Sequence, residues 1–287
     1  MNTVSNVRAP AVAGLFYPRD AGALAAQVDA LLASVPAPAD NARVHMLLSP
    51  HAGYAYSGRV AASGFRLLSS PRVSAPATAI VIGPSHVEVF SFTSIFDGGA
   101  YRTPLGDLPV DASLARRLAG AHPSIRLSSH GHVQARGRGE HGIEVLLPFL
   151  QRALGNVSIV PIVMGSQAWA ECAALGSAIA ACSDAASTIV IASSDLSHFY
   201  DYHRANELDA AFCAALVTMD ARALHASVAR GECEACGAGP VVAALLATEG
   251  ERDRRCRLLT RINSGDVTGD RSSVVGYASA VVTSGGS

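Results

Sequence analysis

The sequence contains no lysine, so all 22 of its basic side chains are arginines. Without a lysine amine the protein cannot form a Schiff base, and it lacks the residue that a Walker-type phosphate loop requires. The chain also has no G-x-S-x-G motif, no P-loop and no G-x-G-x-x-G motif after an expected strand. Nucleotide binding and hydrolysis by a serine on a strand-to-helix turn therefore receive little support.

Charge is scarce as well. Charged residues make up 16% of the chain, the formal net charge is -1, and no run of arginines exceeds a pair. Because binding to a phosphate backbone needs a basic patch, we expect no nucleic-acid partner. No uninterrupted apolar run reaches the roughly 18 residues of a membrane-spanning helix, and the N-terminal residues do not have the pattern of a secretory signal. We expect a cytoplasmic protein without a membrane partner.

The chain does have a large apolar fraction, since 49% of its 287 residues are hydrophobic. This composition predicts one large core, and we expect a single domain over residues 1–287 with an ordered core at about 8–282. Amphipathic helices alternate with apolar runs that predict strands at residues 44–48, 79–82, 157–164, 188–192, 256–262 and 274–282. This alternation predicts an α/β fold, a doubly wound, mostly parallel or mixed sheet with helices on both faces.

Polar side chains follow three of these strands. His51 comes just after the first, His86 just after the second, and Asp195 and His198 after the strand at 188–192. Ligands of open α/β sheets bind in the crevice outside the carboxyl ends of the strands. We therefore expect imidazole and carboxylate groups to meet at one rim of the sheet.

Two histidines and a thiol at this rim would suit zinc, copper or iron. The candidate ligands are His51, His86 and Cys236, although a lone histidine after a strand is more often a hydrogen-bonded structural residue. His198 is a candidate general acid or base near the metal, because its ordinary pKa lies near neutrality. Asp195 is a candidate for the same chemistry or a turn cap.

The six cysteines include one C-x-x-C pair, Cys233 and Cys236. In isolation this pair could be half of a zinc site, a redox pair or chance, and in a reducing compartment we expect free thiols. Cys236 precedes a helix expected from Val241, and a helix N-terminus favours the thiolate that binds metal. The sequence thus predicts a lowered pKa for Cys236 and leaves a Cys233–Cys236 disulfide open.

Several connecting segments carry weaker expectations. Asp97-Gly98-Gly99 has the composition of a hairpin turn, and residues 101–111 read as a loop that could cover the rim. Residues 128–138 read as mobile. Glu140-His141 opens an expected helix through Leu150 and is either simply a helix start or a pair that supports the metal ligands.

A set of ordered motifs carries a family resemblance. They read PAVAGLFYP, SPHAGYAYSG, IGPSH, YRTPLGDLPVD, EHGIEVLLPFLQ, IVPIVMG, SSDLSH and CGAGP. Together they run from about Arg8 to Val282 and resemble the Memo family, whose bacterial members include protein B of the AmmeMemoRadiSam system. The resemblance implies a fold like that of class III extradiol dioxygenases. It also implies a radical-SAM protein and an AMMECR-domain protein as partners.

Carried over residue by residue, the resemblance puts a metal on His51, His86 and Cys236, with Asp195 and His198 beside it. Two positions depart from the related patterns. An extradiol dioxygenase has a carboxylate as its third iron ligand where this chain has Cys236. The family motif usually reads EHSIE, whereas position 142 of this chain is glycine.

Two hypotheses follow from the sequence. The first is a mononuclear metalloenzyme of dioxygenase-like fold, with iron favoured and copper or zinc as alternatives. It would perform a redox or oxygen-dependent step on an unidentified small molecule or protein. The second is a non-catalytic scaffold that binds partner proteins and retains a vestigial metal pocket.

Overall fold

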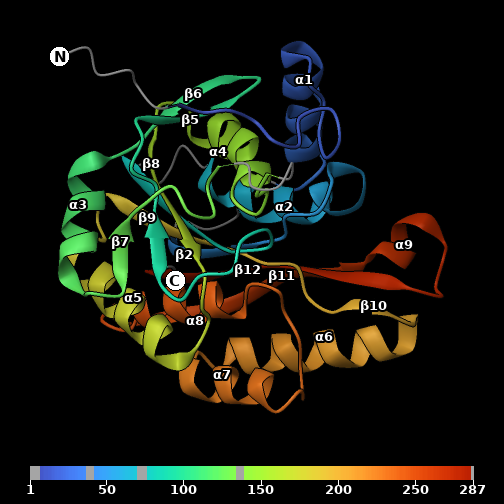
Figure 1. The fold of residues 1–287 in the computed structure, drawn as a ribbon. Coiled ribbons are helices and arrows are strands. Elements are labelled where there is room, and N and C mark those ends of the chain that lie inside the picture. Colours follow the sequence, from blue (N-terminus) through green and yellow to red (C-terminus); the bar gives the residue numbers. More distant parts are fainter. Residues whose placement is uncertain (1–6, 37–41, 70–75, 134–138, 286–287) are drawn as a thin grey trace.

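A central mixed sheet dominates the computed structural model, which describes residues 7–36, 42–69, 76–133 and 139–285 (Figure 1). Within these residues nine strands join in the order β10-β12-β2-β9-β3-β8-β4-β7, with β11 paired to β12. Their bounds are β2 Arg43–Ser49, β3 Thr78–Pro84, β4 Thr93–Ile95, β7 Ile125–Leu127, β8 Ser158–Met164, β9 Thr188–Ser193, β10 His198–Tyr200, β11 Arg255–Asn263 and β12 Val274–Ser284. A smaller sheet joins β1 (Val7–Arg8), β5 (Ala100–Thr103) and β6 (Gly106–Pro109).

The four middle strands, β2, β9, β3 and β8, are parallel. Ala192 of β9 pairs with Leu48 on one side and Ile82 on the other, so these strands end at one edge of the sheet. Every residue of β3 is buried, as expected for a strand covered on both faces. β12 and β4 run antiparallel to their neighbours β2 and β8. The predicted mixed, mostly parallel sheet is confirmed.

Helices cover both faces of the sheet (Figure 1). One face packs against α1 (Ala21–Ala33), α2 (Tyr54–Leu68) and α4 (Leu147–Leu154), whose buried side chains include Leu24, Phe65 and Phe149. The other face packs against α3, α5, α6, α7 and α8. Their bounds are α3 Ala112–Ala121, α5 Trp169–Cys182, α6 Tyr202–Val217, α7 Ala221–Ala229 and α8 Ala238–Ala247. The α/β fold with helices on both faces is therefore confirmed.

Aspartate side chains begin several of these helices. Asp20, Asp111 and Asp220 each accept a hydrogen bond from the backbone N–H three residues later, and Asp201 caps α6 in a related way. A short helix, α9 (Ser264–Thr268), lies between β11 and β12. No helix in the described part of the chain combines the length and apolarity needed to cross a bilayer.

Three local expectations are wrong. The strands on either side of Asp97-Gly98-Gly99, β4 and β5, belong to different sheets and form no hairpin. Residues 101–111 form the β5–β6 hairpin, in which Tyr101 pairs with Leu108, and not a loop. The regular helix after Glu140 begins later than expected, as the 3-10 turn Glu144–Leu146 followed by α4.

The expected mobile segment is tested only in part. Residues 134–138 lie outside the described residues. His132 is fully buried and bonds to the hydroxyl of Tyr101, so this part of the segment is a fixed element of the structure.

Candidate metal centre

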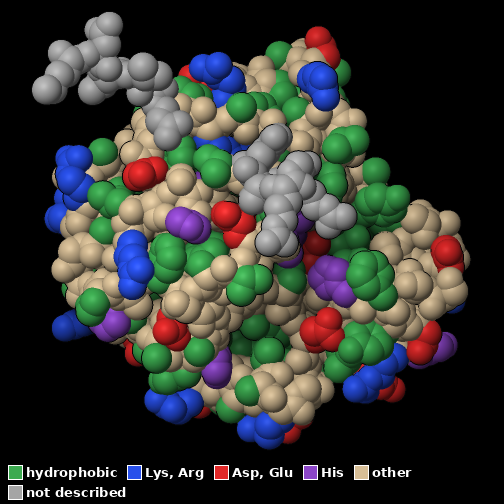
Figure 2. Space-filling view, viewed as in Figure 1, with side chains coloured by type: hydrophobic (Ala, Val, Ile, Leu, Met, Phe, Trp, Pro, Cys, Tyr) green, Lys and Arg blue, Asp and Glu red, His purple; other side chains and the backbone are tan. Residues whose placement is uncertain are grey.

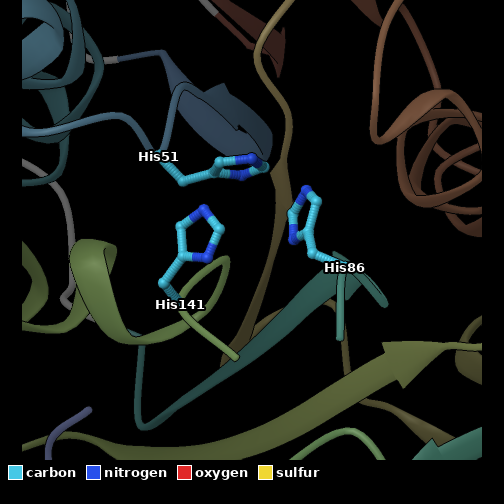
Figure 3. Close-up of side chains that lie close together, drawn as sticks. All are labelled: His51, His86 and His141. Atoms are coloured by element: carbon cyan, nitrogen blue, oxygen red, sulfur yellow. The ribbon is translucent and has the colours of Figure 1, made fainter. Parts of the chain in front are cut away.

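Three histidines converge at the carboxyl edge of the parallel strands. His51 follows β2, His86 follows β3, and His141 lies in the loop before the 3-10 turn. One nitrogen of each ring lies within 4.8 Å of a nitrogen of the other two. The rings point toward one another in Figure 3, with centroids 5.0 Å apart for His51 and His86 and 4.7 Å for His86 and His141. Figure 2 shows histidine and acidic side chains together near the middle of this face.

His51 is buried and held in one orientation. Its Nδ1 lies 2.7 Å from the hydroxyl oxygen of Ser193, and that hydroxyl donates to the carbonyl of Gly142. Because the Ser193 hydroxyl has used its proton, Nδ1 of His51 must donate, which leaves a lone pair on Nε2. Burial lowers the pKa of His51 well below its ordinary value, and the neighbouring histidines add to this. His51 is therefore neutral, the form that binds metal.

Glu140 orients the second histidine. Its carboxylate accepts hydrogen bonds from Nδ1 of His86 at 2.8 Å and from the His86 backbone N–H at 2.6 Å. Burial opposes protonation of His86, but the hydrogen bond and charge of Glu140 outweigh it and raise its pKa. Burial would raise the pKa of Glu140, yet its bonds with His86 and the backbone lower it to about 2. A carboxylate behind a histidine is typical of metal sites, because it aims Nε2 at the ion.

His141 was not among the ligands predicted from the sequence. Glu140 accepts hydrogen bonds from the backbone N–H groups of His141 and Gly142, at 2.8 and 2.9 Å, which turns the chain so that the His141 ring faces the other two. Burial and the neighbouring His86 lower the pKa of His141 to about 4, so this ring is also neutral. The local sequence looked like a helix start, and the EHG triplet inside a family motif was the signal that could have identified it.

Cys236, a ligand predicted from the sequence, lies next to His51. Its Sγ is 3.3 Å from Nε2 of His51 and accepts a hydrogen bond from the backbone N–H of Asp195 at 3.3 Å. Two atoms bound to one tetrahedral ion at about 2.0–2.3 Å lie roughly 3.5 Å apart, so this spacing suits two ligands of one metal.

The prediction of a lowered pKa for Cys236 is wrong. Burial and the nearby Asp195 raise the pKa of the thiol to about 12, because loss of water outweighs the effect of the following helix. Cys233 and Cys236 are both free thiols. Cys233 packs in the apolar core. The pair is therefore reduced and is not a disulfide in this structure.

Asp195 and His198 line the cavity beside the histidines. This cavity has a volume of about 330 Å³, and its wall also includes His141, Phe16 and Tyr277. Asp195 does not cap its own turn; it accepts a hydrogen bond from the distant backbone N–H of His51 at 2.8 Å. Burial raises its pKa to about 6 against the opposing hydrogen bond from His51.

Within the described part of the chain, one ring nitrogen of His198 has no hydrogen-bond partner. Its Nδ1 donates to the carbonyl of Leu196 at 2.8 Å, because a backbone carbonyl can only accept. In the neutral form of this ring, the proton is on Nδ1 and the lone pair is on Nε2. A carboxyl group with a pKa near neutrality and an imidazole with a free nitrogen are both suited to proton transfer in the cavity.

The side chains of this centre fit a transition metal. His51 and His141 are neutral, His86 has a carboxylate behind it, and the Cys236 thiol lies beside His51. Imidazole and thiolate are ligands that zinc, copper and iron accept. An ion would also lower the pKa of the Cys236 thiol, since metal-bound cysteine is deprotonated.

Comparison with known proteins identifies the family of this chain. A sequence model of the family described as Memo-like protein matches residues 8–281. A MEMO1 family protein of Methanothermobacter thermautotrophicus is 36% identical over 283 residues, covering 95% of this chain and 99% of that protein. A MEMO1 family protein of Methanocaldococcus jannaschii is 36% identical over 293 residues, covering 97% and 100%.

A solved structure resembles the fold. It is the crystal structure of an uncharacterized protein from Escherichia coli K12, with a TM-score of 0.53 and 18% identity, covering 83% of this chain and 100% of that one. At this identity the likeness concerns the fold alone.

Proposed function

We propose that this chain, which belongs to the Memo-like protein family, binds one transition-metal ion through His51, His86 and Cys236. The metal serves a redox or oxygen-dependent step on a substrate that enters the neighbouring cavity. His141 faces the same centre and is a further ligand or a contact for the bound substrate.

One observation carries the proposal. The hydrogen bonds of Ser193 and Glu140 occupy Nδ1 of His51 and of His86, so both rings present Nε2 to a common centre. Histidines that are only structural satisfy both ring nitrogens. Among the described residues, Nε2 of His51 has only the Cys236 thiol within hydrogen-bonding distance, and Nε2 of His86 has no hydrogen-bond partner. The arrangement supports a metal site more than a structural cluster.

The bound ion would supply electron transfer or oxygen activation. Iron is favoured over copper and zinc because the family resemblance implies a dioxygenase-like fold. The protein supplies the proton transfers. Asp195 and His198 line the cavity beside the histidines and would move protons to and from the substrate. His198→Ala should therefore keep the metal and lose turnover, and loss of the metal would instead make His198 a ligand.

Metal analysis of protein purified without added metal tests the proposal. Wild-type protein should carry about one ion per chain, and His51→Ala and His86→Ala should carry none with nearly unchanged far-UV spectra, since rim residues contribute little to the core. His122→Ala, at an exposed position, is the matched control and should keep the ion. Full occupancy in both rim variants would contradict the ligand assignment.

The second candidate function is a scaffold with a vestigial metal pocket. It is favoured by the difference at the third ligand position, where extradiol dioxygenases have a carboxylate and this chain has Cys236. Its partners would be the radical-SAM and AMMECR-domain proteins that the family resemblance implies. Wild-type protein that is folded and free of metal would support this function. The free cysteines suit a reducing compartment such as the cytoplasm in either case.

A further inference from the structure

A second, larger cavity shares a wall residue with the cavity beside the histidines. It has a volume of about 730 Å³, and its lining residues come from the C-terminal end of α1, from α2, from β11 and from α9. Figure 1 shows the places of these four elements in the fold. Its wall is mostly apolar, with the side chains of Leu31, Val60, Leu259, Ile262 and Val267. An apolar cavity of this size holds a small organic molecule with room for an extended body.

Tyr56 joins the two cavities. It is the residue that lines both this groove and the cavity beside the metal centre, and its side chain is 45% exposed. Tyr54, the first residue of α2, also lines the groove. Its hydroxyl donates to the carbonyl of Val145, close to the His141 loop. Tyr56 therefore separates the groove from the cavity beside the histidines, and its exposed ring is the point at which a bound molecule would pass from one to the other.

The groove carries one unmet positive charge. Arg59 lies three residues after Tyr56, so both face the groove about 4.5 Å apart along the helix axis. Arg59 is exposed, and among the described residues no hydrogen bond or ion pair occupies its guanidinium. The acidic residue of the groove, Asp266, uses one oxygen for the Tyr202 hydroxyl and the other for the Asn263 backbone. Asp266 is thus committed to the local structure, while Arg59 is free.

We infer that the substrate is an elongated, apolar carboxylic acid whose carboxylate binds Arg59 while its other end reaches the metal centre past Tyr56. The apolar wall matches the body of such a molecule, and the planar guanidinium pairs with a carboxylate through two hydrogen bonds. Arg59 is the one basic residue among the described residues of this wall, which matches a single negative charge better than a phosphate. This inference rests on the proposed function for the reacting end.

Calorimetry with octanoate tests the inference on the purified, metal-containing protein. Wild-type protein should bind octanoate. Arg59→Ala should bind it about tenfold more weakly, the effect of losing one charge-assisted contact, and Arg59→Lys should recover part of the loss. Arg116→Ala is the matched control, because Arg116 is exposed on α3, which packs on the other face of the sheet. Its affinity should equal that of the wild type.

A blocking variant checks the place of binding. Ala55 is exposed and lines the groove, so Ala55→Trp should fill part of it and weaken binding without disturbing the core. Failure of wild-type protein to bind octanoate, or equal affinity in wild type and Arg59→Ala, would overturn the inference. Metal content is measured on the same samples. Octanoate binding through Arg59 in a protein that holds no metal would contradict the proposed function and keep Arg59 as a carboxylate site.

Discussion

Glu140 holds His86 by both its ring and its backbone, with distances of 2.8 Å to Nδ1 and 2.6 Å to the backbone nitrogen. The same carboxylate accepts the N–H groups of the next two residues, His141 and Gly142. One buried side chain thus sets the position of two histidines that come from segments far apart in the sequence. The positions of His86 and His141 depend on this single carboxylate.

Glu140→Gln should therefore weaken metal binding while the protein still folds. The amide keeps the shape of the side chain but removes the charge that fixes the His86 ring, and loss of such a carboxylate typically costs about 10–100-fold in metal affinity. Competition with a chelator measures the change. Glu232→Gln, at an exposed glutamate paired with Arg230, is the control and should have no effect. Equal affinity in all three proteins would remove Glu140 from the centre.

Arg8 and Glu144 form a buried ion pair that ties the N-terminal segment to the His141 loop. Glu144 also accepts the N–H of Val12 at 2.9 Å and the Tyr17 hydroxyl at 2.6 Å. Arg8→Met leaves the Glu144 charge buried without its partner. We expect a loss of about 3–5 kcal/mol in the free energy of unfolding, measured with denaturant.

The matched control is the exposed pair of Arg152 and Asp29. Arg152→Met should cost no more than about 1 kcal/mol, because an exposed ion pair gains little over solvated charges. A small effect of Arg8→Met, similar to that of Arg152→Met, would show that the buried pair does not hold the two segments together.

His132 should make the fold sensitive to acid. Burial lowers its pKa to about 3, and Nε2 donates to the carbonyl of Ser94 while Nδ1 accepts from Tyr101. An unfolded histidine has a pKa of about 6.5, so between these values the unfolded state binds more protons and stability falls as the pH falls. The stabilisation is complete above about pH 6.5 and is lost toward pH 3.

His132→Gln removes this titration. The variant should be less stable than wild type by about 1–3 kcal/mol at pH 7, because buried hydrogen bonds are lost, and the difference should shrink by pH 4. Denaturant unfolding at a series of pH values measures it. His122→Gln, at an exposed position, should follow the wild-type profile. A constant difference between wild type and His132→Gln would contradict a neutral buried His132.

Gly142→Ser should be tolerated. A Cβ at Gly142 would lie 3.4 Å from the Glu140 carboxylate and 3.6 Å from Nδ1 of His51, which are ordinary contacts. We expect a change in unfolding free energy within about 1 kcal/mol and retention of the metal. Gly237→Ser is the contrasting variant, since a Cβ there would overlap the carbonyl oxygen of Ser193. Equal destabilisation of both variants would mean that the loop before the 3-10 turn is packed more tightly than described.

Apolar runs along the sequence correctly predicted the parallel strands and the histidines that follow them. The apolar runs of the parallel strands are buried on both faces, so they were recognisable, and His51 and His86 lie directly after two of them. His141 depends on the bonds of Glu140 to a distant strand end. No spacing along the chain encodes such a contact.

Burial was the quantity that the sequence could not supply. The position of Cys236 before α8 was predicted, and by itself it favours the thiolate. In the folded protein the thiol is enclosed near Asp195, and its pKa rises. The hairpin of β5 and β6 was missed for a different reason. Its strands have only four residues each, too few to show a clear alternation of apolar and polar side chains.

X-ray absorption spectroscopy of the metal-loaded protein tests the central claim most directly. The proposed ligands predict a shell of nitrogen atoms from His51 and His86 and one sulfur atom from Cys236, at about 2.0–2.1 and 2.3 Å for zinc. Cys236→Ser should lose the sulfur shell and keep the nitrogen shell. A wild-type spectrum with nitrogen and oxygen ligands alone, or a sulfur shell that persists in Cys236→Ser, would contradict the proposed metal centre.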